Sequence, residues 1–183
     1  VVAIDRSLPM LERTQARCAD LGRVAALAGD AERLPLADNS ADLIFANLIL
    51  PWCAPESVFG EAARVLREGG LLSFTTVGPD TLAEVRRAWA DIDDAIHVHG
   101  FIDMHDIGDL ALRARLTEPL LDLDTLQVTY RDLASLVADL RACGATNVAA
   151  GRRTTLTGRA RLAAFREALH ATRSAGRFEV TVE

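Results

Sequence analysis

The sequence predicts an α/β fold with a mainly parallel sheet, and three observations carry this prediction. Short apolar runs rich in β-branched residues alternate with segments whose apolar residues recur at helical spacing. The expected order from the N-terminus is strand, helix, strand, strand, helix, strand and helix, and such alternation favours right-handed crossovers between parallel strands. The run at residues 41–50 is apolar enough for a strand that is buried on both faces, as in a parallel sheet.

The elements of this sheet are bounded by turn and capping residues. Strands are expected at residues 1–4, 24–28, 41–46 and 71–77. Helices are expected at residues 8–21, 55–66 and 80–91, with Ser7 as a cap, Gly22 as a stop and Pro55 in a first turn. The carboxyl ends of three of these strands therefore lie at one edge of the sheet.

Residues 91–118 interrupt this alternation. Their start is rich in Asp and His, and a capped helix is expected at residues 103–115. We interpret the stretch as a lid-like helical insertion over the carboxyl edge of the strands, within a single domain that spans residues 1–183. The remaining elements are expected to be strands at 121–130 and 178–182 and helices at 133–143 and 159–173.

Composition narrows the class of protein. The 183 residues are 50% apolar and 25% charged, which is typical of a soluble globular domain, and no apolar run reaches the roughly 18 residues of a membrane span. A net charge of -6 argues against general affinity for nucleic acid, although the charge is -10 over residues 1–130 and +4 over residues 131–183. Three widely spaced cysteines without a CxxC pair predict neither a disulfide framework nor a zinc knuckle. We expect a cytoplasmic protein whose basic tail suits an acidic partner.

Five motifs carry a resemblance to a known family. Three of them, DRSLPML at 5–11, GDAERLPLADNSADLIFANLIL at 29–50 and REGGLLSFTTVGPDTL at 67–82, resemble the class I S-adenosylmethionine-dependent methyltransferases from their second strand onward. Two more, GFIDMHDIGDLAL at 100–112 and LLDLDTLQVTYRDLASLVADLRACGATN at 120–147, are similar to the malonyl-acyl-carrier-protein O-methyltransferases of biotin synthesis.

The resemblance implies a Rossmann-like sheet that is mostly parallel, with an antiparallel C-terminal strand and helices on both faces. It also implies S-adenosyl-L-methionine as cofactor and malonyl-acyl carrier protein as substrate and partner. The family's first strand, which is central in its sheet, would precede Val1, so its absence would leave strand edges unpaired. Arg115 stands where the family tends to have Gly, so a left-handed helix cap is not expected there.

Two alternatives stay open at this point. A related branch with a similar DMHDIGD segment hydroxylates an arginine during assembly of respiratory complex I. The other alternative is a methyltransferase-like protein that has no catalytic activity and acts as an assembly factor.

The candidate cofactor site lies at the strand ends. Asp5 is predicted to accept hydrogen bonds from both ribose hydroxyls, because an ionised carboxylate offers two acceptor oxygens. The alternative for Asp5 is a helix cap, and the alternative for Asp30 is a plain turn residue. The resemblance implies that Asp30 accepts from the adenine amino group while the Ala31 N–H meets a ring nitrogen. Arg6 and Met10 belong to the same predicted site, although a Met on an apolar helix face is more often a core residue.

The remaining candidates concern the methionine part of the cofactor and the substrate. Asn47 and Leu48 follow the strand at 41–46 and are expected to approach that part of the cofactor. The substrate-binding candidates are Trp52, His99, Tyr130 and Arg131, and the sequence selects no catalytic residue among them.

A metal site is a weaker hypothesis. Zinc and iron accept imidazole and carboxylate side chains as ligands, and the candidates in this part of the chain are His97, His99, His105, Asp103 and Asp106. The two carboxylates are better explained by the first turn of a helix, where negative charge is favourable, so no metal is expected.

Overall fold

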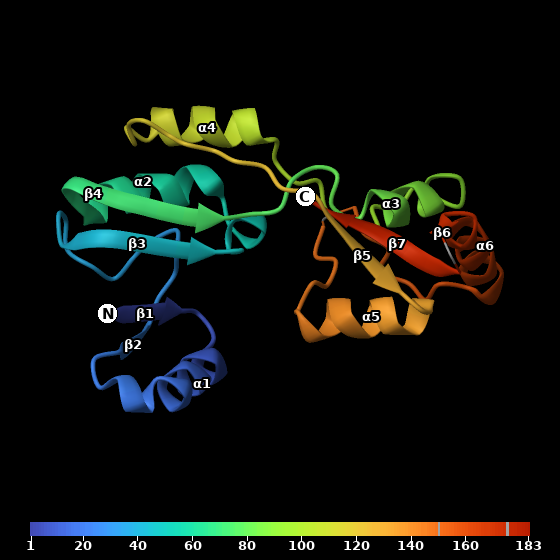
Figure 1. The fold of residues 1–183 in the computed structure, drawn as a ribbon, viewed down its shortest axis with the longest axis horizontal. Coiled ribbons are helices and arrows are strands. Elements are labelled where there is room, and N and C mark those ends of the chain that lie inside the picture. The colour runs from blue at the N-terminus through green and yellow to red at the C-terminus, as the bar shows by residue number, and fades with distance from the viewer. Residues whose placement is uncertain (150, 175) are drawn as a thin grey trace. The chain divides into compact units, whose positions relative to one another are not determined.

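The computed structural model describes residues 1–149, 151–174 and 176–183, and the chain forms two compact units (Figure 1). The first unit comprises Val1–Thr76 and His105–Leu121, and the second comprises Val77–Met104 and Asp122–Glu183. Residues 91–118, predicted to form one insertion, are therefore divided between the two units.

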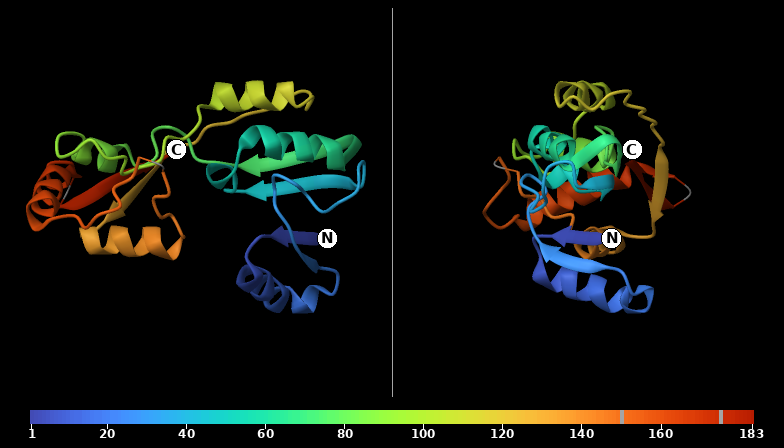
Figure 2. Two further views of the ribbon diagram at one scale, coloured as in Figure 1. Left: turned by 180° about the vertical axis from the view of Figure 1, so that it is seen from behind. Right: turned by 90° about the vertical axis from the view of Figure 1, so that its left-hand side faces the viewer.

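The first unit contains two parallel strand pairs with their helices. Its elements are β1 (Val2–Asp5), α1 (Leu8–Arg17), η1 (Ala19–Leu21), β2 (Ala25–Ala28), β3 (Ala41–Asn47), η2 (Leu50–Trp52), α2 (Pro55–Val65), β4 (Leu66–Thr75) and α4 (Met104–Arg113). β1 pairs with β2 and β3 pairs with β4, both in parallel, and the two pairs are separate sheets. Figure 2 shows α1 following β1 and lying beside the β1–β2 pair, as the predicted strand–helix–strand order requires.

The helix α2 builds the core of the first unit. Its apolar residues recur at helical spacing, and those that are buried are Val58, Phe59, Ala62 and Val65. The Phe59 ring lies 5.4 Å from the ring of Phe74 on β4. The predicted helix at 55–66 is thus present almost as expected, because its apolar stripe has a sheet face to cover.

Two details of the β3–β4 pair differ from the sequence prediction. β3 is not buried on both faces, since Leu43 and Phe45 are 56% and 67% exposed while Ala46 is buried. Side chains alternate along a strand, and the pair packs one face toward α2. β4 begins at Leu66 rather than at residue 71, because Gly69 at φ +74° allows a bulge that keeps Leu66 opposite Ala41.

The second unit contains an antiparallel sheet with three helices. Its elements are α3 (Ala83–Ala90), β5 (Leu126–Tyr130), α5 (Leu133–Ala142), α6 (Arg159–His170), β6 (Arg173–Ser174) and β7 (Arg177–Val182). The strand order is β5–β7–β6, and both pairings are antiparallel, which confirms the predicted antiparallel end of the chain. Its core includes the buried residues Leu136, Phe165, Leu169, Phe178 and Val180.

The strand expected at 121–130 is shorter in the structure, and only Leu126–Tyr130 pairs with β7. Leu121 belongs to the first unit, where its side chain packs against Gly108 of α4. A Cβ on Gly108 would lie only 3.1 Å from Leu121 Cδ1. Leu121 therefore packs against a helix instead of taking part in strand pairing. In the part of the chain that the structure describes, no helix combines the length and the apolar character needed to span a bilayer.

The end of α4 has a left-handed cap, contrary to the expectation for Arg115. Arg115 has φ +65°, and the Leu116 N–H donates to the Ala111 carbonyl at 3.0 Å, as in a Schellman cap. The cap satisfies a carbonyl at the helix end, and this hydrogen bonding outweighs the steric cost of a Cβ in the left-handed region.

We expect Arg115→Gly to raise the free energy of unfolding by about 1 kcal/mol, because glycine adopts a positive φ without the clash of a Cβ. Urea denaturation measures the change. Arg115→Ala retains the Cβ and is expected to give no such gain. Equal stability of the glycine and alanine variants would contradict the prediction.

Candidate functional site

Asp5 and Asp30 lie at neighbouring ends of the parallel strands β1 and β2. The register places Asp5 opposite Ala28, and the Gly29 N–H donates to the Asp5 carbonyl at 3.1 Å. Asp30 follows directly, and its Oδ2 lies 3.4 Å from Nη1 of Arg6. Both carboxylates therefore lie at the carboxyl edge of one strand pair, where ligands of parallel sheets bind.

Each carboxylate is oriented by the turn that follows it. Oδ1 of Asp5 accepts a hydrogen bond from the Ser7 N–H at 2.7 Å, and Oδ1 of Asp30 accepts one from the Glu32 N–H at 3.0 Å. An ionised carboxylate has about four lone-pair positions, so both side chains retain acceptor capacity for a ligand. Asp5 thus acts in a local turn and is not the helix cap of the alternative interpretation, because Ser7 holds the N-cap position of α1.

Asn47 and Leu48 lie at the end of β3, where Thr75 of β4 fixes them. The Leu48 N–H lies within hydrogen-bonding distance of two acceptors of Thr75, the carbonyl at 3.0 Å and Oγ1 at 3.2 Å. Thr75 Oγ1 donates to Asn47 Oδ1 at 2.6 Å. Leu48 has φ +54°, which costs a residue with a Cβ about 1–2 kcal/mol. Thr75 was not predicted, although a hydroxyl at the end of the expected strand 71–77 was a signal for it.

Apolar side chains with exposed surface accompany these polar groups. Met10, Leu48 and Trp52 are each about half exposed. The turn after Trp52 is joined to the Asp30 loop, because the Ala54 N–H donates to Glu32 Oε1 at 2.8 Å.

Cys53 lies in this turn, and the carboxylates of the Asp30 loop affect the pKa of its thiol. Burial raises the pKa of the Cys53 thiol, and the nearby carboxylates of Glu32 and Asp30 raise it further. The thiol is therefore kept protonated close to the loop that carries Asp30, and it lies beside the candidate site without being part of the predicted set.

The other substrate-binding candidates lie on the second unit, whereas Trp52 lies on the first. Burial raises the pKa of Tyr130, and a hydrogen bond with Asp139 adds to the effect. Arg131 is largely exposed, with Nε 3.8 Å from Oδ2 of Asp132. The His99 ring is 6.5 Å from that of Phe101. The geometry does not select any one of these three residues as the one that binds the substrate.

His97 takes part in a charged cluster around Asp93. The His97 Nε2 is 2.7 Å from Asp93 Oδ1, and the His97 ring is stacked on Trp89 at 3.7 Å. Asp93 Oδ2 lies 3.1 Å from Arg153 and 3.9 Å from Arg161. Within the described ranges, no three His, Cys, Asp or Glu side chains gather closely enough to hold a metal ion.

The hydrogen bond with His97 lowers the pKa of Asp93. Burial opposes this effect, while the Ala95 N–H and Arg153 lower the pKa further by smaller amounts. A carboxyl whose folded-state pKa is lowered adds stability above its unfolded pKa of about 4, and this stability is lost as the pH falls through the folded value. We expect wild-type protein to lose more thermal stability than Asp93→Asn between about pH 5 and pH 2.5. Asp94→Asn, at an exposed neighbouring position, is the control and should follow the wild-type curve. Parallel melting curves for wild type and Asp93→Asn would refute the prediction.

The chain is similar to known proteins in sequence and in fold. A family model described as a methyltransferase domain matches residues 1–74. A malonyl-[acyl-carrier protein] O-methyltransferase of Xylella fastidiosa is 44% identical over 176 residues, which cover 96% of this chain and 60% of the relative. The protein of the same name from Gallionella capsiferriformans is 38% identical over 190 residues, which cover 100% of this chain and 66% of the relative. The chain is therefore similar in sequence to methyltransferases along nearly its whole length.

The fold of the chain also agrees with that of a solved structure. A candidate methyltransferase from Bacillus halodurans superposes with a TM-score of 0.60 at 19% identity, covering 100% of this chain and 78% of that one. This likeness confirms the predicted Rossmann-like fold class. The chain spans 60% and 66% of the lengths of the two curated relatives. In this chain, the predicted cofactor residues Asp5, Arg6, Met10, Asp30 and Ala31 all lie on β1, α1 or the loops that follow β1 and β2.

Proposed function

We propose that the protein transfers a methyl group from S-adenosylmethionine to the free carboxylate of malonyl-acyl carrier protein, in biotin synthesis, and that it acts in the cytoplasm. The observation that carries the proposal is the 44% identity, over 96% of the chain, to a malonyl-[acyl-carrier protein] O-methyltransferase. The position of Asp5 and Asp30 at adjacent strand ends supports it, because two carboxylates at that edge suit the two ends of an adenosine.

The residues at the strand ends fit this cofactor. Asp5 accepts hydrogen bonds from the ribose hydroxyls, and its turn with Ser7 holds the carboxylate toward them. Asp30 accepts from the adenine amino group, while the Ala31 N–H donates to a ring nitrogen. Met10, about half exposed on the first turn of α1, packs on the nucleoside. S-adenosylmethionine supplies an electrophilic methyl group.

Methylation of a carboxylate needs no general base. The malonyl carboxylate is ionised near neutral pH and is itself the nucleophile. The protein contributes by holding the carboxylate oxygen in line with the methyl carbon, and such placement supplies most of the rate. Tyr130 is one candidate for this role, but its hydroxyl already donates its single proton to Asp139, so binding the carboxylate would require it to exchange that partner. His99 and Arg131 are the other candidates for orienting the carboxylate. Trp52 is the candidate for lining the substrate side of the site.

The partner's docking surface is proposed to lie on the basic end of the chain. An acyl carrier protein is acidic, and residues 131–183 carry a net charge of +4. Arg153 is only 22% exposed and pairs with Asp93, so it is poorly placed to meet a partner. Arg159 and Arg161, in the first turn of α6, are exposed and suit this role better.

Calorimetry with S-adenosylhomocysteine tests the cofactor site. The titration is made on this chain and on a version extended at Val1 with the preceding strand of a curated relative. Binding by either form supports the proposal, and binding by neither contradicts it and favours a non-catalytic assembly role.

Mass spectrometry after incubation with malonyl-acyl carrier protein and S-adenosylmethionine tests the reaction. We expect the malonyl group to gain the mass of one methyl group. An oxygen added to an arginine of another protein, with no methylated malonyl group, would instead support the hydroxylase alternative.

A further inference from the structure

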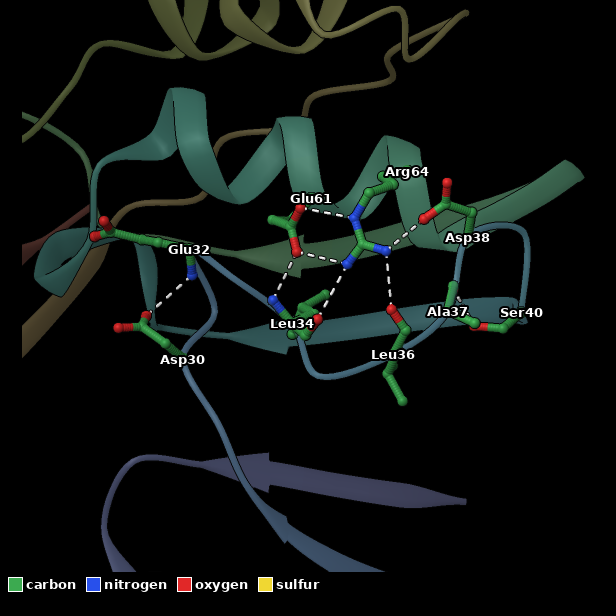
Figure 3. A network of polar contacts seen from close by, with 9 residues as sticks. All are labelled: Asp30, Glu32, Leu34, Leu36, Ala37, Asp38, Ser40, Glu61 and Arg64. Carbon is green, nitrogen blue, oxygen red and sulfur yellow. Dashed lines mark hydrogen bonds and ion pairs between the residues drawn. The ribbon is translucent and has the colours of Figure 1, made fainter.

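The guanidinium of Arg64 uses all of its donors to bind one loop and one neighbouring carboxylate (Figure 3). Its Nε and Nη2 donate to the two oxygens of Glu61 at 2.8 and 2.7 Å. Its Nη1 donates to the Leu36 carbonyl at 2.8 Å and to Asp38 Oδ1 at 2.7 Å, and Nη2 also donates to the Leu34 carbonyl at 3.0 Å. An arginine has five N–H donors, so none is left for solvent.

Glu61 completes this arrangement from the same helix. Its Oε2 accepts the Leu34 N–H at 2.7 Å, so both backbone polar groups of Leu34 are bound by the Glu61–Arg64 pair. The side chains of Glu61 and Arg64 are 18% and 32% exposed, which partly shields the pair from water. The hydrogen bond from Arg64 lowers the pKa of Glu61 below its ordinary value.

The loop held by this pair is the one that begins at Asp30. The Arg33 N–H donates to the Asp30 carbonyl at 3.0 Å, so the turn that carries Asp30 leads directly into Leu34. The next residue, Pro35, packs on the end of β2, because a Cβ at Gly29 would lie 2.7 Å from Pro35 Cδ. The conformation of Asp30 is therefore set from both sides, by β2 before it and by α2 through the loop after it.

We infer that Arg64, oriented by Glu61, is a positioning residue for the nucleoside site: it fixes the loop 31–38 so that Asp30 meets the adenine amino group. The inference rests on the proposed function, because Asp30 has a base to recognise only if the protein binds an adenosine. Selectivity for adenine should then depend on a side chain that does not touch the ligand.

Arg64→Lys tests this inference. Lysine keeps the positive charge but has three donors on one nitrogen, so it cannot bind Glu61 with two parallel hydrogen bonds and also hold two loop carbonyls. The measurement compares the Kd of S-adenosylhomocysteine with that of S-inosylhomocysteine, which has a carbonyl oxygen in place of the amino group. We expect the wild-type preference for the adenine ligand to fall about tenfold in Arg64→Lys, the loss of roughly one hydrogen bond to a charged acceptor.

Three further variants separate positioning from general loss of structure. Arg67→Lys changes an arginine of the same region whose ion partner is Asp42, and it should leave the preference unchanged. Glu61→Gln retains an acceptor for the Leu34 N–H and should give a smaller loss than Arg64→Lys, which keeps the test valid if the latter folds poorly. In an Asp30→Ala background, Arg64→Lys should have no further effect on the preference, because it acts through Asp30.

Amide hydrogen exchange across residues 33–40, without ligand, should be faster in Arg64→Lys than in wild type or Arg67→Lys. If neither the wild-type chain nor its extended version binds either ligand, the proposed function fails and this inference fails with it. If wild type prefers the adenine ligand and Arg64→Lys keeps the same preference, the inference alone is overturned.

Discussion

Asp5→Ala is expected to weaken binding of S-adenosylhomocysteine by about 100-fold or more. The variant removes the acceptor proposed for two ribose hydroxyls, and each hydrogen bond to a charged group contributes about 1.5–3 kcal/mol. Calorimetry on the form of the protein that binds the ligand measures the change. Because Asp5 is exposed at the end of β1, the melting temperature should change little.

Asp5→Asn is the matched variant for this experiment. The amide oxygen still accepts the Ser7 N–H, so the turn after β1 is kept, while one acceptor and the negative charge are lost. Its affinity should lie between those of wild type and Asp5→Ala. Unchanged affinity in Asp5→Ala would refute the ribose role and leave Asp5 as a turn residue only.

Phe178→Ala is expected to lower the free energy of unfolding of the second unit by about 3–5 kcal/mol. Phe178 lies in β7 and is 2% exposed. The Arg173 guanidinium lies 4.4 Å from the centre of its ring, and the His170 ring meets it edge-on at 5.1 Å. Removing the ring leaves a cavity between α6 and the sheet and also removes these two contacts.

Urea unfolding followed by circular dichroism and by the fluorescence of Trp89, the tryptophan of this unit, measures the loss. Leu156→Ala, at a side chain that is 96% exposed, is the control and should change stability by less than about 0.5 kcal/mol. A similarly small loss in Phe178→Ala would show that the core of this unit is not centred on β7.

The elements that the sequence predicted well have strong local signals. α2 begins at Pro55, because proline fixes a helix start. The helix expected at 8–21 is divided into α1, which ends at Arg17, and η1, and it is η1 that Gly22 closes in the left-handed conformation. Asp132 caps α5 by accepting the Ser135 N–H at 2.8 Å. Such signals act within a few residues, so they can be recognised without the fold.

The predictions that failed have two different physical causes. The residues at 121–125 were expected to belong to a strand, but Leu121 packs against α4 instead, which is a tertiary contact. Arg115 adopts the left-handed conformation that its side chain disfavours, because the carbonyls at the end of α4 need a donor. At Arg115 the local hydrogen bonding of the helix end outweighs the conformational preference of the residue.

In the candidate site, too, some residues could be predicted from the sequence and others could not. Asp5 and Asp30 are predictable because a polar residue after a buried strand marks the ligand edge of a parallel sheet. Thr75 and Arg64 were not predicted, since their roles depend on partners 28 and 30 residues away, Asn47 and Leu34.

The sequence by itself determined the order of strands and helices, the residues at the strand ends and the resemblance to the class I methyltransferases. Only the tertiary structure decided which backbone groups Arg64 binds, how Asp30 is oriented and which face of β3 is covered. The physical reason is that periodicity and capping are local properties of the chain. Hydrogen-bond partners and burial, by contrast, are set by where the chain returns in space.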